Sequence, residues 1–235
     1  VDEAYQIVFE GRIPVERPRD ARDVLGTFRV VSDDIGMSRS IRDASEFLDV
    51  LKSRHYEVMA SRPEMRPGEF KTVTNRAGST QFVEPERVPG TLIKGFQLLE
   101  TLTNPMARAL FVKYLTVDVH PFLDGNGRTA RIMMNAELVK AGEARIIVPS
   151  VYRDNYINAV ARLRRENDPL PYVRAMEFAR TFSASLDYSD YGLLVQQLEQ
   201  ARAFSKPSET RLILPRNVRF ESATDAISTT ARSPL

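Results

Sequence analysis

The stretch His120–Arg131 constrains the fold of this chain most strongly, because it places a dense polar run between two apolar helical patterns. Before it, Asn104 and a following proline have the form of a helix cap and first turn, and apolar residues then recur at helical spacing. After it, residues 129–140 repeat the helical pattern until Ala141-Gly142 ends it. We therefore expect two helices joined by a tight loop that leads into the N-terminus of the second helix.

The residue types in this loop are those of a phosphate site. Free N–H groups and the positive end of the helix dipole favour anions at a helix N-terminus. Gly125 and Gly127 allow the backbone to approach a phosphate closely. Arg128 and Arg131 fall on one face of the helix, where two guanidinium groups can hold successive phosphates. Asp124 offers the oxygen ligand that Mg²⁺ takes beside nucleotide phosphates.

His120 adds a candidate base to this phosphate site. An unperturbed histidine titrates near neutral pH, so it can accept the proton of an attacking hydroxyl. The plain structural alternative is a turn made by Asp and Gly, a cap made by Asn, and solvated arginines. The combination of base, metal ligand, glycines and paired arginines favours nucleotide chemistry over that alternative.

The run His-Pro-Phe-Leu-Asp-Gly-Asn-Gly-Arg-Thr-Ala-Arg at 120–131 resembles the signature of the Fic family at every defining position. Most members of that family transfer AMP from ATP to a hydroxyl side chain of a target protein. The resemblance extends over residues 60–180 and implies a mostly α fold with a small β-hairpin flap. In that fold the signature loop joins two central antiparallel helices.

The resemblance also implies a role for each matching residue. His120 would be the general base, and Asp124 would be the Mg²⁺ ligand beside ATP. Residues 126–128 would bind the α- and β-phosphates, and Arg131 would bind the γ-phosphate. The ring residues Pro121 and Phe122 would anchor the loop in the core. The signature residues expected to contact the nucleotide are Asp124, Gly125, Asn126, Gly127, Arg128, Thr129, Ala130 and Arg131.

Residues 69–83 form the one persuasive β pattern of the chain, with alternating side chains on either side of turn residues at 75–78. By itself this predicts a surface hairpin, which is marginal unless it packs on helices or receives a partner. In the Fic family the matching stretch is the flap, which holds a target segment by strand addition. The resemblance therefore implies a protein target docked on this hairpin. It also implies nucleotide contacts from Asn75, Arg76, Ala77 and Gly78.

Residues 1–11 predict a short helix that ends at Gly11. The end of this helix resembles an inhibitory motif of many Fic proteins, in which Ser or Thr, three further residues and Glu precede Gly or Asn. In that motif the glutamate pairs with the second signature arginine, so the resemblance implies a pair between Glu10 and Arg131. Gln6 stands where Ser or Thr is expected. An ordinary helix end with an exposed glutamate is the alternative.

Three other expectations concern single residues or segments. From Arg12 to Gly26 the chain is charged, which predicts a loop or a brief helix at Ala21–Leu25 with a solvated face. His55 lies in the charged run Lys-Ser-Arg-His-Tyr and is expected to be exposed. Tyr156 stands where the family often places a residue against adenine, although an aromatic stripe of this kind is more often core.

The bulk properties bound the organisation of the chain. It has 235 residues, 43% of them hydrophobic and 27% charged, with a net charge of +2, so no overall field attracts nucleic acid or membrane. The absence of cysteine fits a cytoplasmic protein, and no apolar run has membrane-spanning length. We expect an N-terminal helical region at 1–60, a catalytic core at 61–204 and a peripheral tail at 205–235.

Together these features predict a Mg²⁺-dependent protein adenylyltransferase that uses ATP and is autoinhibited by Glu10. Family members often self-associate, so the resemblance also implies a homodimer. One alternative is a relative that moves UMP, phosphocholine or a terminal phosphate, or that removes AMP. Another is a nucleotide-binding module with silent catalysis. Asp124 and Gly127 are both intact, which favours AMP transfer over the kinase-like branch of the family.

Overall fold

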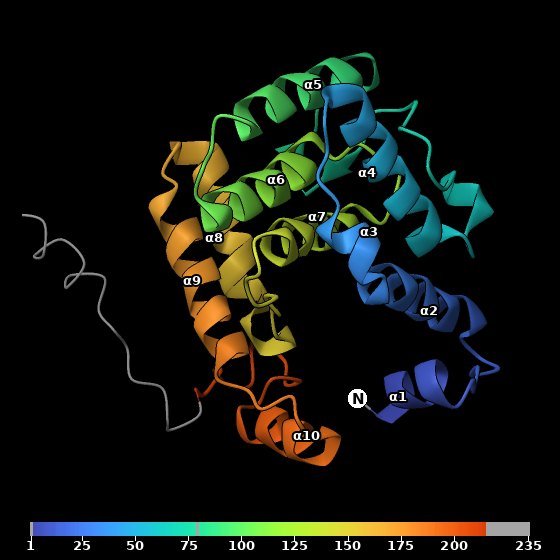
Figure 1. Cartoon of the computed structure of the whole chain (residues 1–235), viewed down its shortest axis with the longest axis vertical. Coiled ribbons are helices and arrows are strands. Elements are labelled where there is room, and N and C mark those ends of the chain that lie inside the picture. The colour runs from blue at the N-terminus through green and yellow to red at the C-terminus, as the bar shows by residue number, and fades with distance from the viewer. Residues whose placement is uncertain (1, 79, 215–235) are drawn as a thin grey trace, which may run out of the picture. The chain divides into compact units, whose positions relative to one another are not determined.

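A computed structural model describes residues 2–78 and 80–214, which are mostly α-helical (Figure 1). These residues contain ten α-helices and one two-stranded sheet. The chain divides into two compact units, Val1–Ile146 and Ile147–Leu235. The predicted fold class, mostly α with a small β-hairpin, is confirmed. The functional division at residues 60 and 204 stays a prediction, and most of the expected tail at 205–235 lies outside the described residues.

The first unit is built on the antiparallel helix pair α6 (Pro105–Val119) and α7 (Asn126–Lys140), which lie side by side in Figure 1. The Asn104 side chain caps α6 as predicted, because it accepts a 2.9 Å hydrogen bond from the N–H of Ala107. The second helix begins at Asn126 rather than at the predicted Thr129. Gly125 has a φ of 75°, and this left-handed residue turns the chain directly into the helix.

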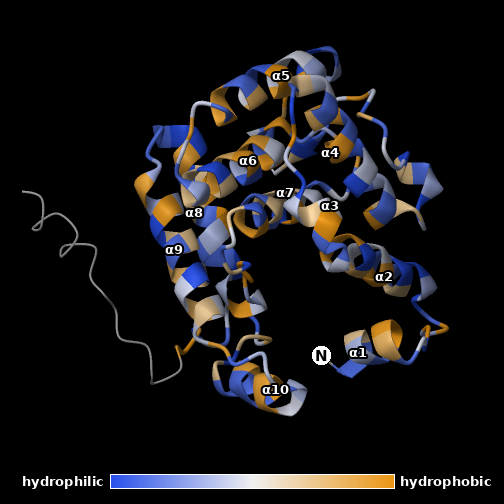
Figure 2. Ribbon diagram, in the orientation of Figure 1, coloured by the Kyte–Doolittle hydropathy of each residue, from blue (hydrophilic) through white to orange (hydrophobic). Residues whose placement is uncertain are grey.

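Further helices cover this pair and pack on it through separate buried apolar clusters. These helices are α2 (Pro18–Ser32), α3 (Asp34–Ser38), α4 (Ala44–Met59) and α5 (Val88–Leu99). Helix α5 packs on α6 and α4, while α4 also packs on α2 and α7. Figure 2 shows apolar residues recurring along α5 and α6. The cluster between α4, α5, α6, α7 and the signature loop consists of Phe47, Leu51, Val88, Leu92, Phe96, Leu99, Val112, Leu115, Val119, Phe122 and Met133. The cluster at α3 consists of Met37, Val58, Met59, Ile132 and Ala136.

Helix α2 departs from the sequence expectation. The brief helix predicted at Ala21–Leu25 is too short, because the structure has a helix of 15 residues there, Pro18–Ser32. The helix also has a buried face, which includes Ala21, Asp23 and Gly26. Gly26 lies where α2 crosses α4, and its missing side chain lets α2 approach the backbone of that helix.

The hairpin consists of β1 (Arg76–Ala77) and β2 (Thr80–Gln81), which pair as antiparallel strands. Its strands are shorter than the β pattern of 69–83 predicts, because the chain before them bonds to the signature loop. The N–H of Lys71 donates to the carbonyl oxygen of Pro121 at 2.8 Å. Short 3₁₀-helices lie at Pro63–Met65, Pro85–Arg87 and Ser150–Tyr152.

The N-terminal helix α1 (Asp2–Phe9) packs on α2. The Phe9 ring meets the edge of Phe28 with their centroids 5.7 Å apart. Gly11 follows with a φ of 68°, so it ends the helical segment as the sequence predicts.

The second unit contains α8 (Arg153–Glu166), α9 (Leu170–Ala184) and α10 (Tyr191–Gln200). Helices α8 and α9 pack together. Leu212 and Leu214 pack against a buried cluster that includes Phe182 and Leu186, so the short apolar run of the tail is docked within this unit. No helix in the described part of the chain is long and apolar enough to cross a membrane.

We predict that Gly26→Ala destabilises the protein, because the new methyl group would overlap the carbonyl oxygen of Glu57 in α4. Overpacking of this kind costs about 1–3 kcal/mol. Gly90→Ala is the matched control, since a Cβ there would meet nothing within 4 Å. Alanine is also the better helix former at such a position. Urea unfolding of both variants measures the difference, and equal stabilities would contradict the close approach of α2 to α4.

Candidate functional site

The buried side-chain amide of Asn126 closes the loop at 120–125 with two hydrogen bonds. The Oδ1 atom of Asn126 accepts from the N–H of Phe122 at 2.9 Å, and its Nδ2 donates to the Phe122 carbonyl at 2.9 Å. Asn126 is only 2% exposed, so its side chain serves the loop rather than a ligand. The N–H of Thr129 makes the first bond of the helix, to the carbonyl of Gly125 at 3.0 Å. Residues 126–128 come before Thr129 in the helix, so their N–H groups lie at the helix N-terminus, where anions are favoured.

His120 ends α6 in a left-handed conformation with a φ of 52°. Its ring stacks on Phe82, which follows β2, with centroids 3.9 Å apart and planes 12° from parallel. The Nδ1 atom lies 3.4 Å from the Val117 carbonyl oxygen. A carbonyl only accepts, so a hydrogen bond there places the proton on Nδ1 and makes Nε2 the basic nitrogen of the ring. This geometry is compatible with the predicted base.

The charged residues of the signature lie at the border of the loop. The Asp124 side chain is 53% exposed, and its Oδ2 lies 3.8 Å from Nη2 of Arg128. Arg131 is exposed one turn later on α7, beside the exposed Gly127. One carboxylate, two guanidinium groups and the first N–H groups of α7 therefore gather at one helix end.

The described residues contain no cluster of three His, Cys, Asp or Glu side chains that could hold a metal. A single carboxylate still fits Mg²⁺, which in nucleotide sites takes most of its ligands from phosphates and water. The half-exposed Asp124 has the donor chemistry for that arrangement.

Lys113 places a buried amine near Arg131. It lies on α6 and is 1% exposed. Burial, and after it the charge of Arg131, lowers the pKa of Lys113 well below its ordinary value.

Two further residues expected to bind nucleotide also face the interior of the first unit, as Asn126 does. Thr129 and Ala130 are both 0% exposed. The Thr129 hydroxyl donates to the Gly125 carbonyl at 3.1 Å. These side chains support the turn, so a nucleotide contact from either residue is left to its backbone.

The four flap residues divide into a base and a tip. At the base, Oδ1 of Asn75 accepts from Nζ of Lys71 at 2.7 Å, and Nδ2 of Asn75 donates to the carbonyl of Phe122 at 3.0 Å. At the tip, Arg76 donates to Gln81 at 2.7 Å, and Ala77 and Gly78 are exposed. Asn75 therefore supports the signature loop, while residues 76–78 form the exposed part of the hairpin.

Tyr156 and Glu10 complete the predicted site residues. Tyr156 lies half-buried on α8 in the second unit, with its ring centroid 6.3 Å from that of Tyr172. The Glu10 carboxylate pairs with Arg12 at 3.1 Å, so the predicted pair with Arg131 is not formed in this structure. The adenine contact and the inhibitory role stay predictions.

His55 is a supporting residue that sequence reasoning missed. The prediction that it is exposed is wrong, since it is 0% exposed and stacks on Phe122 with ring centroids 3.7 Å apart. Its Nδ1 accepts from the N–H of Gly68 at 2.9 Å, so Nε2 carries the proton and donates to the Asp124 carbonyl at 3.0 Å. A neutral His55 thereby fixes the loop backbone. Its helical spacing from the buried Leu51 and Met59 was the available sequence signal.

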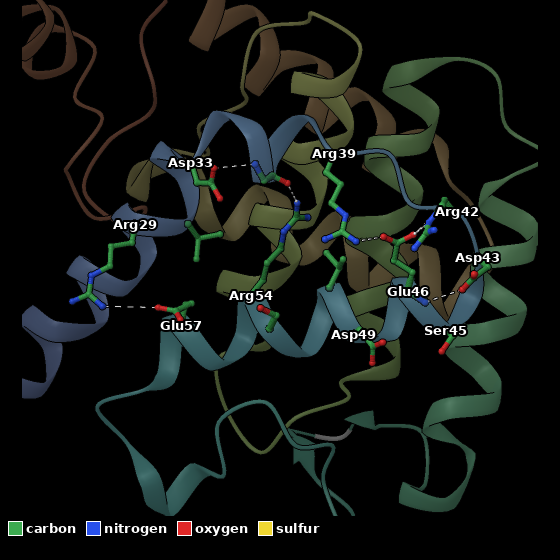
Figure 3. Close-up of a pocket in the computed structure, with 14 residues that line it drawn as sticks. Arg29, Asp33, Arg39, Arg42, Asp43, Ser45, Glu46, Asp49, Arg54 and Glu57 are labelled. Carbon is green, nitrogen blue, oxygen red and sulfur yellow. Dashed lines mark hydrogen bonds and ion pairs between the residues drawn. The ribbon is translucent and has the colours of Figure 1, made fainter.

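A separate cavity of about 700 Å³ is lined by residues of α2, α3 and α4 and of the chain between the last two (Figure 3). Its charged side chains mostly pair with one another. Arg39 and Arg42 both bond to Glu46, and Arg54 donates to the carbonyl of Gly36 at 2.8 Å. Of the described residues that line this cavity, none belongs to the predicted site.

Comparison with known proteins agrees with the loop geometry. Residues 45–138 match the Fic/DOC family. A protein adenylyltransferase Fic from Drosophila persimilis is 34% identical over 128 residues, which cover 51% of this chain and 24% of that protein. The aligned part of the chain therefore spans about a quarter of the length of such curated relatives.

Solved structures show the same fold. A Fic-1 fragment from C. elegans matches with a TM-score of 0.64 and 24% identity, over 76% of this chain and 54% of that one. A Fic domain containing signaling protein from Bacteroides thetaiotaomicron matches with a TM-score of 0.64 and 18% identity, over 81% of this chain and 83% of that one.

We predict that His55 makes the protein less stable as the pH falls. Burial of the ring lowers the pKa of His55 to about 4, against 6.5 for an unperturbed histidine. Between these values the unfolded chain binds a proton that the folded chain does not, so stability falls as pH falls through this window. The loss approaches about 3 kcal/mol near pH 4. Urea unfolding at a series of pH values measures it.

Carboxylates also titrate in this range, so the test is a difference between variants. His55→Gln removes the titrating ring but keeps an amide that can accept and donate. Acidification should therefore lower the free energy of unfolding of this variant less than that of the wild-type protein. His120→Gln removes the other histidine of the chain and should keep the full loss. A His55→Gln profile parallel to that of wild type would contradict the assignment.

Proposed function

We propose that this chain, whose residues 45–138 match the Fic/DOC family, is a Mg²⁺-dependent protein adenylyltransferase. It would move AMP from ATP to the hydroxyl of a Tyr, Thr or Ser side chain in a target protein. The observation that carries this proposal is the closed loop at 120–125, which brings a histidine, a carboxylate and a guanidinium group to the N-terminus of α7. The relatives named protein adenylyltransferase support the reaction class.

In the proposed reaction, the target hydroxyl gives its proton to Nε2 of His120. Its oxygen attacks the α-phosphorus in line and forms a new P–O bond. The bond from that phosphorus to the bridging oxygen of the β-phosphate breaks, and pyrophosphate leaves. Arg128, Arg131 and the first N–H groups of α7 would stabilise the phosphate charge. When bound at Asp124, Mg²⁺ would neutralise part of the same charge.

The hairpin is the proposed docking place for the target. Its paired strands at 76–77 and 80–81 can accept an extended segment by strand addition. Two hydrogen bonds, from Lys71 to Pro121 and from Asn75 to Phe122, tie its base to the signature loop. Phe82 stacks on His120, so a segment added to this hairpin would present its hydroxyl close to the base. The nucleophile then belongs to the target, and the enzyme contributes position and charge.

We predict that His120→Ala lowers the transfer of label from α-labelled ATP by at least about 100-fold, because a general base typically contributes about 10²–10⁴-fold. Label transfer to the target or to the protein itself, measured with Mg²⁺ present, tests this. Nucleotide affinity should change little, since the imidazole is assigned to the hydroxyl rather than to phosphate. Transfer that persists undiminished in the variant would remove His120 from the mechanism.

Intact mass after incubation with ATP and, separately, with other nucleotides distinguishes the alternatives. A gain equal to AMP supports the proposal. A gain equal to UMP, phosphocholine or phosphate would identify a relative with another donor, and loss of AMP from a modified protein would identify the reverse reaction. Nucleotide binding without any gain would identify a silent binding module. A homodimer, also expected from the family, is tested by sedimentation of the same samples.

We further propose that Glu10 restrains this reaction. The inhibitory pair with Arg131 would require Glu10 to leave Arg12. Both of these side chains are exposed, and surface ion pairs generally contribute only about 0–1 kcal/mol, so breaking the observed pair costs little. The supporting observation is the match of residues 9–11 to the end of the inhibitory motif.

Glu10→Gly should therefore raise self-modification severalfold, measured as the rate of AMP incorporation. Arg12→Ala is the matched control, because it breaks the observed pair but keeps the glutamate. This control should leave self-modification unchanged or lower it. Equal rates for Glu10→Gly and the wild-type protein would show that the glutamate is an ordinary helix end.

A further inference from the structure

Arg128 is held by an acidic residue from a distant part of the chain. Its Nη1 donates to Oδ2 of Asp23 at 2.6 Å, and its Nη2 lies 3.0 Å from the sulfur of Met59. Asp23 lies on α2, outside residues 45–138 that match the family. The contact therefore joins the N-terminal helical segment to the phosphate-binding end of α7.

Asp23 is built into the structure as a fixed acceptor. It is 7% exposed, and its Oδ1 accepts from the Ser61 hydroxyl at 2.7 Å. Its Oδ2 accepts from Nε of Arg62 at 2.8 Å in addition to Arg128. Burial alone would raise the pKa of Asp23, but the hydrogen bonds from Ser61, Arg128 and Arg62 outweigh it and lower that pKa. The carboxylate is thus charged and immobile at neutral pH.

The backbone beneath Asp23 is fixed as well. Ala21 is 1% exposed, and Gly26 lies against the carbonyl of Glu57 in α4. Ser61 and Arg62, which hold the carboxylate, directly follow the end of α4. Asp23 therefore cannot follow Arg128 if the arginine moves, so the arginine is held to the position of the carboxylate.

A single contact from Asp23 leaves Arg128 able to bind a ligand. A guanidinium group has five N–H donors, and only one nitrogen is used by this carboxylate. The Arg128 side chain is 26% exposed, and its Nη2 lies on the side of Asp124, 3.8 Å from Oδ2. A long side chain with many rotamers is thereby reduced to one arrangement at the border of the loop.

We propose that Asp23 is a positioning residue that orients the Arg128 guanidinium for the phosphates of the nucleotide. The inference rests on the proposed function, since it assigns Arg128 to an ATP phosphate. Asp23 itself touches no substrate in this scheme. Asp23 could instead compete with phosphate for Arg128. In that case removal of the Asp23 carboxylate would tighten nucleotide binding, which is the opposite of what we expect.

The test is the affinity of the full chain for Mg-ATP, measured by calorimetry. Asp23→Asn removes the charge at constant size and should weaken binding about tenfold, the lower range for loss of such a supporting group. Ser61→Ala, which loosens the carboxylate without touching Arg128, should weaken binding by a smaller factor and perturb the fold less. Asp20→Asn is the matched control, because Asp20 lies on the same helix and pairs with Arg62 but is 59% exposed.

A double-mutant cycle separates positioning from a general structural role. If Asp23 acts only through Arg128, then Asp23→Asn has no further effect on ATP affinity in an Arg128→Ala background. A loss that persists in that background would overturn the proposal. Unchanged or tighter binding by Asp23→Asn alone would also overturn it.

Failure of the underlying function gives a different result. A wild-type protein that does not bind Mg-ATP would overturn the proposed function and with it the reason for a positioned Arg128. A wild-type protein that binds Mg-ATP, with an Asp23→Asn variant that binds equally well, would overturn the positioning role alone.

Discussion

The two hydrogen bonds between the Asn126 side chain and the Phe122 backbone hold the loop on which every proposed catalytic group depends. The loop has neither helix nor strand pairing of its own, so its buried backbone groups must be satisfied by side chains. His55 satisfies the Asp124 carbonyl, and Asn75 makes a second bond to the carbonyl of Phe122. The polar atoms of three separate segments therefore determine the shape of this one turn.

The same loop is anchored by an apolar ring at its centre. Phe122 is 0% exposed and lies against the rings of His55 and Phe70, with centroid distances of 3.7 and 5.6 Å. Burial of a phenylalanine side chain contributes about 1.5–3 kcal/mol, which helps to offset the cost of ordering an irregular turn. A hydrophobic anchor thus lets the neighbouring His120 and Asp124 stay accessible at the surface without the loop becoming mobile.

Local patterns were sufficient to predict α6, the loop and α7, because the Asn104 cap, the helical spacing and the polar run are all read within a few residues. They were insufficient for Asp23 and His55. The partners of Asp23 include Arg62 and Arg128, and those of His55 include Gly68 and Asp124, all brought together only by folding. The charged sequence neighbours of Asp23 and His55 predicted that both side chains are exposed to solvent. Their long-range partners satisfy the polar atoms of these side chains, so both can be buried.

The hairpin is another element that the local sequence pattern predicted only in part. Its alternating pattern was correct for a β segment but overestimated the paired length, because Lys71 bonds to Pro121 instead of to a strand. The alternating side-chain pattern indicates which residues can lie in a strand. The length over which two strands pair also depends on whether other acceptors bind their backbone N–H groups. Here the competitor is the signature loop.

Burial acts on two lysines beside this loop, and a neighbouring charge acts on one of them. Lys71 and Lys113 are 2% and 1% exposed, and burial lowers the pKa of both. The charge of Arg131 lowers that of Lys113 further. The positive charge of Arg131 disfavours the charged form of Lys113, and strongly shifted groups of this kind are concentrated at functional sites. Under the proposed function, a polyphosphate bound at the N-terminus of α7 would oppose this shift, because a nearby negative charge favours the charged form of a lysine.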